Sequence, residues 1–332
     1  MTTKKPATLL ALAGTAALVV AGPATFASPP TPADTRPDAG ATASSLPVGD
    51  VDTALTSKSG QTTQVEQAQA TDEADPASVV SIIVQLNDGA DRAASLASIN
   101  EAVAGAFPGA SAQVEREYDN ALQGFALNAP AGSLDAIRAA SGVKAAFRDR
   151  ETRVADADDQ VAGEGATNSA RTTTQDPANL SAQLMMHADQ VTQKGEGKVV
   201  AVVDTGVDMT HPAFAGALGG TPALSADKVA SLTPQLGDGK AGTYVSEKFP
   251  FAYDYADNDP DASPTGQAGS HGTHVAGIAA GNAGEIVGIA PDAQIIVAKV
   301  ARSVEGDITD SGLLAALDDM VILHPDVINL SL

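Results

Sequence analysis

An aspartate that directly follows an apolar run is the first candidate for chemistry. Residues 199–203 read VVAVV, Asp204 comes next, and Gly206 allows a tight turn. A carboxylate at the end of a buried strand is costly unless it is ionised and hydrogen-bonded. By itself the pattern leaves open catalysis, binding of a nucleotide ribose or Mg²⁺, and the start of a turn. The sequence contains no G-x-G-x-x-G or G-K-[ST] loop beside it, which disfavours a nucleotide.

A second cluster, S-H-G-T-H-V-A-G at residues 270–277, begins a run of small residues that predicts a helix packed closely on a sheet. We expect His271 in the first turn, beyond the strand ends. The positive end of the helix dipole disfavours imidazolium, so the ring would stay neutral and available as a base. His271 and His274 lack the spacing and the intervening Glu of the helical zinc signature, which disfavours a metal site. His274, with its apolar neighbours, is predicted to be a core histidine.

The charge and composition exclude several classes of protein. The 332 residues include 19 Lys and Arg against 41 Asp and Glu, for a formal net charge of -22. Nucleic acid is therefore not expected as a partner, because binding a phosphate backbone depends on Lys and Arg. The acidity suits an exported, soluble protein. The sequence has no cysteine, which excludes disulfides, cysteine-based zinc sites, thiol nucleophiles and iron–sulfur clusters.

The N-terminus has the pattern of a secretory signal peptide over residues 1–27. Lys4 and Lys5 precede an apolar stretch at residues 7–21, and small residues follow where a signal peptidase would cut. This stretch is shorter than the roughly 20 apolar residues of a spanning helix, and no later stretch reaches that length, so no transmembrane segment is predicted. Residues 28–76 are rich in Pro, Ala, Thr and Ser and are predicted to be a disordered spacer.

Residues 77–150 predict a small α+β domain with the ferredoxin-like element order β-α-β-β-α-β. The expected strands are residues 79–86, 112–118, 124–128 and 143–147. The expected helices are residues 90–104 and a short helix capped by Ser133. The segment has no His, no Cys and no carboxylate pair singled out by spacing, so we expect it to bind a partner, with a purely structural role as the alternative. Residues 151–179 are predicted to be an exposed linker open to proteolytic cleavage.

Residues 180–332 alternate between helical patterns and apolar strands, which predicts an α/β fold with a parallel sheet covered by helices on both faces. The expected strands are residues 199–203, 295–300 and 327–330. The expected helices are residues 180–192, the segment that carries His271 and His274, and residues 311–323. A turn is expected at residues 195–197.

Asp204 and His271, in this order, are more specific together than either is alone. Further motifs accompany them in a fixed order: D-T-G-V-D at 204–208, H-P at 211–212, H-G-T-H-V-A-G at 271–277, G-I-A-P at 288–291 and V-I-N-L-S-L at 327–332. With these motifs the chain resembles the subtilisin-like serine peptidases, or subtilases, from about residue 180 onward. Residues 77–150 resemble the inhibitory propeptide of that family. The insertion at residues 218–270 is similar to the cell-envelope proteinase subgroup.

The resemblance implies an Asp-His-Ser triad in which Asp204 orients His271, and His271 takes the proton of a serine hydroxyl. It also implies that Gly306 lends one edge to an extended peptide substrate, while Ser331 and Leu332 wall the pocket for the residue before the cut. The implied partners are polypeptide substrates and the propeptide, which acts as an intramolecular inhibitor. The implied location is extracellular, with association with the cell wall in the cell-envelope subgroup. No cofactor other than calcium is implied.

Two features of the family are missing from the sequence. Leu332 precedes the positions of the oxyanion-hole Asn and of the G-T-S-M-A-type nucleophile loop, and no such loop occurs upstream. We therefore expect the chain to be the N-terminal part of a longer precursor and to be inactive alone.

A calcium site is not identifiable either. Ala213 stands where the family often carries an Asp, the loop at 281–285 is short, and the Asp-rich segment 254–261 is expected to be solvated, so calcium binding stays open. The alternative function is that of a non-catalytic secreted protein. Its propeptide-like domain would bind or inhibit a separate peptidase.

Overall fold

The computed structural model describes residues 75–153, 183–184, 186–264, 269–284, 286–304 and 306–332. Residues Asp75–Leu332 belong to one compact unit, and the second unit, Pro23–Ala74, lies outside the described residues. The predicted signal peptide, nearly all of the predicted spacer and most of the predicted linker also lie outside them. Below, the N-terminal segment is residues 75–153, and the C-terminal segment is residues 186–332.

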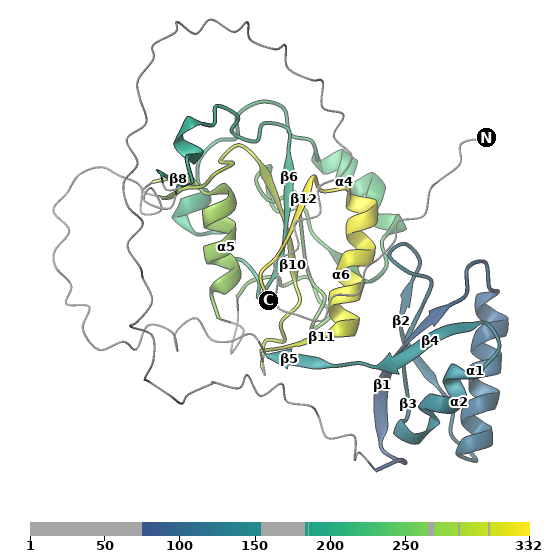
Figure 1. Ribbon diagram of the computed structural model, residues 1–332. Helices are drawn as coiled ribbons and strands as arrows, with labels where there is room; N and C mark the ends of the chain where they lie inside the picture. Colours follow the sequence, from purple (N-terminus) through teal and green to yellow (C-terminus); the bar gives the residue numbers. More distant parts are fainter. Residues whose placement is uncertain (1–74, 154–182, 185, 265–268, 285, 305) are drawn as a thin grey trace, which may run out of the picture. The chain divides into compact units, whose positions relative to one another are not determined.

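The N-terminal segment is built on a four-stranded antiparallel sheet with the strand order β2-β3-β1-β4. Its strands are β1 (Val79–Leu86), β2 (Gln113–Tyr118), β3 (Gly124–Pro130) and β4 (Val143–Arg148). Helices α1 (Arg92–Ala106) and α2 (Leu134–Arg138) share one hydrophobic core with one face of this sheet, through Ile99, Val103 and Ile137. The predicted element order β-α-β-β-α-β is therefore confirmed (Figure 1).

The two helices of the N-terminal segment begin in different ways. Asp91 caps α1, because its carboxylate accepts a hydrogen bond from the backbone N–H of Ala94 at 2.7 Å. The predicted cap at Ser133 is wrong: its hydroxyl donates to the carbonyl oxygen of Pro130 at 2.6 Å. Ser133 closes a short 3₁₀ helix, η1 (Ala131–Ser133), that continues directly into α2, so its side chain does not face the first amides of α2.

The C-terminal segment contains a four-stranded parallel sheet with the order β12-β6-β10-β7. Its strands are β6 (Val199–Asp204), β7 (Phe251–Asp254), β10 (Gln294–Lys299) and β12 (Val327–Leu330). Along β6, Ala201 and Val203 face one core and Val202 faces the other, as the alternation of strand side chains requires.

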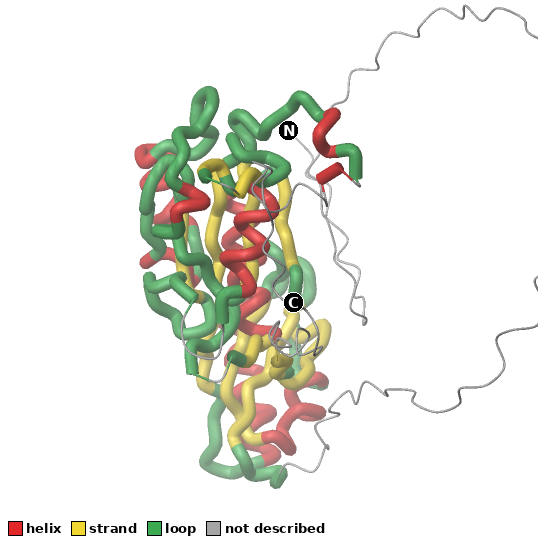
Figure 2. Tube along the Cα trace, turned by 90° about the vertical axis from the view of Figure 1, so that its left-hand side faces the viewer, coloured by secondary structure: helices red, strands yellow, loops and turns green. Residues whose placement is uncertain are grey.

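Helices cover both faces of this sheet. On one face lies α5 (His271–Ala280), and on the other lie α4 (Ala226–Leu232) and α6 (Asp310–Leu323) (Figure 1; Figure 2). Ala276 and Ala280 bring α5 close to the sheet, as small side chains allow. The predicted α/β fold with both faces of the sheet covered is confirmed. None of the helices in the described ranges is both long enough and apolar enough to cross a lipid bilayer.

Several elements differ from the sequence prediction. Of the predicted helix 180–192, residues 180–182 and 185 lie outside the described residues. Residues 183–184 are helical, and the 3₁₀ helix η3 (Ala188–Gln190) follows a left-handed His187 with φ 55°. The strands β5 (Glu151–Arg153), β7 and β11 (Asp307–Thr309) and the helix α4 were not predicted. The remaining short elements are η4 (Pro212–Phe214), η5 (Thr233–Gln235), η6 (Asp238–Ala241), β8 (Asn282–Ala283) and β9 (Ile286–Val287).

Buried polar side chains attach the insertion at residues 218–270 to the sheet. The amide of Gln294, on β10, accepts from the N–H of Leu224 and donates to the carbonyl oxygens of Leu224 and Glu247. Lys248 is 5% exposed, and its ammonium group donates at 2.8 Å to two carbonyl oxygens in the loop before β10, at residues 291 and 293. Burial lowers the pKa of Lys248 from 10.5 to about 8.

The lowered pKa of Lys248 predicts a pH dependence of stability. Between pH 8 and pH 10.5 the unfolded chain binds a proton that the folded chain does not, so stability rises with pH across this window. The burial penalty on the ammonium is fully present below pH 8 and is lost by pH 10.5. We expect Lys248→Met to remove a slope of up to about 1.4 kcal/mol per pH unit, measured by urea unfolding at several pH values. Lys228→Met, at an exposed position of the same insertion, should retain the slope; equal slopes in both variants would refute the assignment.

Candidate active site

The carboxylate of Asp204 is buried at the carboxyl end of β6. Its residue is 1% exposed, and one carboxylate oxygen, Oδ1, accepts a hydrogen bond from the N–H of Thr205 at 2.7 Å. The backbone carbonyl of Asp204 accepts from the N–H of Val300 at 2.9 Å, which continues the β6–β10 ladder by one residue. The strand thus fixes the backbone and leaves the carboxylate facing the space beyond the sheet.

His271 faces this carboxylate from the first residue of α5. Its Nδ1 lies 2.9 Å from Oδ1 and 3.1 Å from Oδ2 of Asp204. Because an ionised carboxylate only accepts hydrogen bonds, Nδ1 carries the proton and donates it. The other ring nitrogen, Nε2, is then free to act as a base, and the side chain is 29% exposed, so a substrate can reach it.

Gly272 lets α5 approach β6 closely enough for this contact, and Gly206 forms the turn after β6. Gly206 has φ 101°, a left-handed conformation that glycine adopts readily. A Cβ on Gly272 would lie 2.4 Å from the carbonyl oxygen of Gly206 and 3.0 Å from Oδ1 of Asp204. The N–H of Gly272 also donates to the hydroxyl oxygen of Thr205 at 3.0 Å. The first turn of α5 is therefore held directly against the end of β6.

His274 is not the core histidine that the sequence predicts. The side chain is exposed, because the buried face of α5 is formed by Gly272, Ala276, Gly277 and Ala280. Two residues along a helix correspond to about 200° of rotation at 3.6 residues per turn, so a residue two positions from Gly272 or Ala276 points away from the sheet. The apolar neighbours in the sequence were misleading, because they occupy a different face of the helix.

The sequence of this chain is similar to a known family of proteins and to several known proteins. Residues 195–332 match the family model described as "Subtilase family". The chain is 34% identical over 168 residues to the PI-type proteinase of Lactococcus lactis subsp. cremoris, an alignment that covers 47% of this chain and 8% of the relative. The C-terminal segment thus matches the subtilase family over residues 195–332, and it is called the subtilase segment below. The resemblance predicted from the sequence is thereby confirmed.

Two further relatives agree. The chain is 28% identical over 236 residues to the minor extracellular protease Vpr of Bacillus subtilis (strain 168), covering 66% of this chain and 24% of the relative. It is 35% identical over 153 residues to the thermophilic serine proteinase of Bacillus sp. (strain AK1), covering 44% of this chain and 28% of the relative. The chain therefore spans only a minor part of the length of each of these relatives.

The other predicted site residues lie next to two different strands of the subtilase segment. Gly306, with φ 74°, is buried and immediately precedes β11. Ser331 and Leu332 follow β12, and Leu330 pairs with Val203, so these two residues lie at the same end of the sheet as Asp204. The hydroxyl of Ser331 donates to the side-chain oxygen of Asn329 at 2.8 Å. A role for these three residues in substrate binding remains a prediction.

A buried ion pair next to Asp204 was not found from the sequence. Lys299 pairs in register with Asp204 at the end of β10, and its ammonium group lies 2.6 Å from a carboxylate oxygen of Asp254 at the end of β7. Both side chains are 1% exposed. Burial raises the pKa of Asp254, while the hydrogen bond from Lys299 opposes that rise. A lysine at the end of an otherwise apolar strand was the signal in the sequence.

The acidic segment 254–261 is folded mainly through its own hydrogen bonds. Asp254 binds Lys299 and accepts from the backbone N–H groups of Ala256 and Asp257. Asp259 and Asp261 each accept from an N–H two residues ahead. Within the described residues, His and acidic side chains form no group of three or more that could hold a metal ion.

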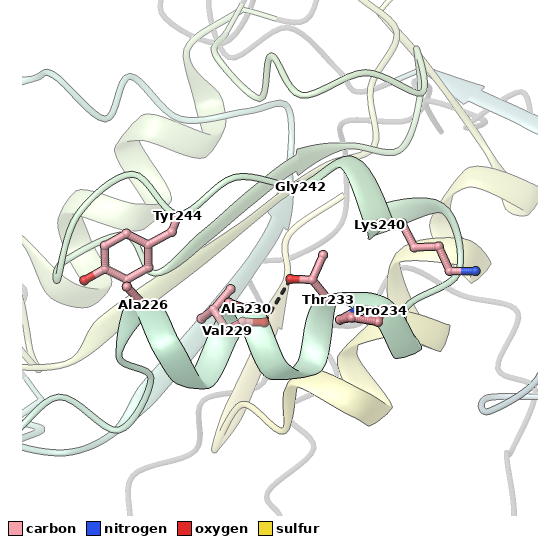
Figure 3. A pocket seen from close by; sticks show the side chains of 8 residues that line it. All are labelled: Ala226, Val229, Ala230, Thr233, Pro234, Lys240, Gly242 and Tyr244. Atoms are coloured by element: carbon pink, nitrogen blue, oxygen red, sulfur yellow. Dashed lines mark hydrogen bonds between the residues drawn. The ribbon is translucent and has the colours of Figure 1, made fainter.

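A groove of about 500 Å³ lies on the insertion, away from Asp204 and His271 (Figure 3). Lys240 and Tyr244 lie at its opposite ends, and α4 with η5 forms its floor. Its lining residues belong neither to β6 nor to α5. The groove therefore carries no part of the Asp-His geometry.

The close approach of α5 to β6 predicts the effect of two glycine substitutions on one helix. Gly272→Ala should destabilise the fold by about 1–3 kcal/mol and shift His271 away from Asp204, because its Cβ would overlap the backbone of Gly206. Gly277→Ala is the matched control, since the nearest atom to its Cβ is 3.7 Å away. The control should be neutral or should stabilise the fold by up to about 1 kcal/mol through helix propensity. Thermal unfolding and a crystal structure check both; equal stability of the two variants would contradict the packing argument.

Proposed function

We propose that the subtilase segment takes part in the hydrolysis of peptide bonds through an Asp-His-Ser triad, to which this chain contributes Asp204 and His271. The observation that carries the proposal is the contact of 2.9 Å between Nδ1 of His271 and the buried carboxylate of Asp204. This carboxylate fixes the tautomer of the ring and stabilises the imidazolium that forms when Nε2 accepts the proton of a serine hydroxyl. The protein would thus be a serine-type endopeptidase.

The substrate edge next to Gly306 supports binding of an extended peptide. β11 pairs antiparallel with β5, with Ile308 opposite Thr152, so this edge of the subtilase segment accepts an extended chain (Figure 1). Main-chain pairing of this kind gives affinity with loose sequence preference. We propose that polypeptide substrates bind along β11, and that Ser331 and Leu332 wall the pocket for the residue before the cut.

The N-terminal segment would act as an intramolecular inhibitor, a propeptide whose last strand occupies the substrate edge. Besides the pairing of β5 with β11, several hydrogen bonds join it to α6. The carboxylate of Asp318 accepts from three successive backbone N–H groups at residues 119–121, at 2.6–3.2 Å. Asp149 accepts from the N–H of Ser311 at 2.9 Å, and the buried Tyr118 donates to the carbonyl oxygen of Ser311 at 3.0 Å. While these contacts persist, β5 competes with substrate.

Secretion is proposed from the signal-peptide pattern at residues 1–27, and it agrees with the name of the extracellular relative from Bacillus subtilis. The similarity to the PI-type proteinase of Lactococcus supports the proposal that the protein is of the cell-envelope subgroup and associates with the cell wall. The Asp-His-Ser chemistry itself needs no cofactor. Calcium binding stays open, without an identified site.

A second function is favoured by the hydrophobic core that the N-terminal segment has of its own. This cluster, which includes Ile82, Phe125 and Leu127, is distinct from the two clusters on the parallel sheet, one of which also contains Tyr118 and Ala126 of the N-terminal segment. Such a segment could bind or inhibit a separate peptidase through β5. The purified segment would inhibit a subtilase in trans under either function, so only an activity measurement on the protein itself distinguishes them.

The triad predicts which histidine matters for activity. In the protein expressed from its complete coding region, His271→Ala and Asp204→Asn should each lower kcat for a peptide substrate by about 10⁴-fold or more. His274→Ala is the matched control on the same helix and should leave kcat unchanged within about twofold, because this side chain is exposed and points away from Asp204. Peptide hydrolysis at the unsubstituted rate in the His271 variant would rule out the proposed mechanism.

The inhibitory role predicts the effect of removing one anchoring charge. Asp318→Asn replaces an acceptor of hydrogen bonds by an amide whose NH₂ group faces the same donors. We expect the amides of residues 119–121 to exchange with solvent about 10- to 100-fold faster, measured by hydrogen exchange on this chain. Asp227→Asn, exposed on α4, serves as the control and should not change their exchange. Unaltered protection in the Asp318 variant would count against docking through α6.

A further inference from the structure

The insertion of the subtilase segment supplies a second contact surface for the N-terminal segment, separate from β11 and α6. We propose that its loop at residues 237–241 recognises Arg116 through Asp238, and that this pair makes the N-terminal segment selective for subtilases with an acidic residue at that place. The inference rests on the proposed inhibitory role of the N-terminal segment. It goes beyond that role because it names the residues that decide which subtilase is bound.

The contact is formed by one guanidinium group on β2. One of its terminal nitrogens, Nη1, forms an ion pair with the carboxylate of Asp238, and the other, Nη2, donates to the carbonyl oxygen of Tyr255 at 2.8 Å. The side chain of Arg116 is 9% exposed and that of Asp238 is 18% exposed. Both acceptors belong to the insertion, so Arg116 is bound by atoms of that insertion.

The loop that carries Asp238 is held in place by a different acidic residue. Asp319, on α6 and fully buried, accepts from the N–H groups of Gly237 at 2.6 Å and Gly239 at 2.8 Å. It also accepts from the hydroxyl of Tyr255 at 2.9 Å. The bonds to residues 237 and 239 hold the backbone on both sides of Asp238. The bond to Tyr255 holds the residue whose carbonyl oxygen accepts the hydrogen bond from Arg116. The surface is therefore positioned by the subtilase segment itself.

Burial is what makes this pair a determinant of selectivity. Removing one partner of a buried ion pair leaves the other charge without compensation, which is far more costly than losing an exposed pair. A subtilase with a neutral or basic residue in place of Asp238 would force Arg116 into its surface without a counter-charge. Such a subtilase would be bound more weakly, because Arg116 would be buried without a counter-charge. Specific interfaces commonly reject wrong partners in this way.

Charge reversal with rescue tests the proposal on the chain itself. A site for a sequence-specific protease is introduced within residues 154–182, the folded chain is cut there, and the Kd between the two resulting pieces is measured by dilution. We expect Arg116→Asp and Asp238→Arg each to raise Kd by about 100-fold or more. The double variant should bind at least about 10-fold more tightly than either single variant, because the charges are paired again. Asp238→Asn, which keeps the size of the side chain, should raise Kd by about 10-fold or more.

Two exposed charge reversals are the controls: Lys144→Asp on β4 and Asp227→Arg on α4 should change Kd by no more than about twofold. Circular dichroism of each uncut variant verifies folding, and Asp238→Asn decides the question if a reversal variant fails to fold. Two results would overturn the inference and leave the inhibitory role intact. The first is that Asp238→Asn and the single reversals all give Kd values within about threefold of the unsubstituted chain. The second is that the double variant binds no more tightly than the weaker-binding single variant. Pieces that separate at once even without substitutions would overturn both.

Discussion

The buried carboxylate of Asp204 is the constraint on which the site depends. A carboxylate that is only 1% exposed is costly unless its oxygens are hydrogen-bonded. Here the donors are the N–H of Thr205 and the ring of His271, which come from the strand itself and from the helix that packs against it. The need to satisfy one charge thus fixes the distance between β6 and α5. The glycine at position 272 makes this distance attainable.

The two faces of the parallel sheet carry different groups of contacts. α5 brings His271 to the end of β6 from one face, while α6 packs on the other face and carries the contacts to the N-terminal segment. Both depend on the same parallel strands, since the residues of β6 alternate between the two cores. β11, along which a substrate is proposed to bind, directly precedes α6 in the chain, because β11 ends at Thr309 and α6 begins at Asp310. Under the proposed function, substrate binding and docking of the N-terminal segment would therefore involve adjacent residues.

Besides its apolar residues in the two hydrophobic clusters, the insertion is attached to this frame through polar groups that are themselves buried. Lys248, Gln294 and Asp319 each bind backbone atoms of a neighbouring loop, and burial raises the pKa of Asp319. Such groups contribute little net stability when satisfied, but an unsatisfied member is costly, so they specify one arrangement of the loops. This explains how a long irregular insertion can present a defined surface at residues 237–241.

The parts of the protein that depend on a local pattern could be predicted from the sequence. The strand at residues 327–330 and the strand and helix positions around Asp204 and His271 followed from apolar runs and from the spacing of Gly and His. The burial of His274 was predicted wrongly, because apolar composition alone does not say which face of a helix meets the sheet. Within the described residues, the predicted helix 180–192 is interrupted at the left-handed His187, a backbone conformation that the apolar pattern does not reveal. β5, the anchors on α6 and the pair Arg116–Asp238 join residues that are far apart in the chain. These contacts became visible only in the folded structure. A short polar strand or a single charge acquires its role from a partner that the local sequence does not identify.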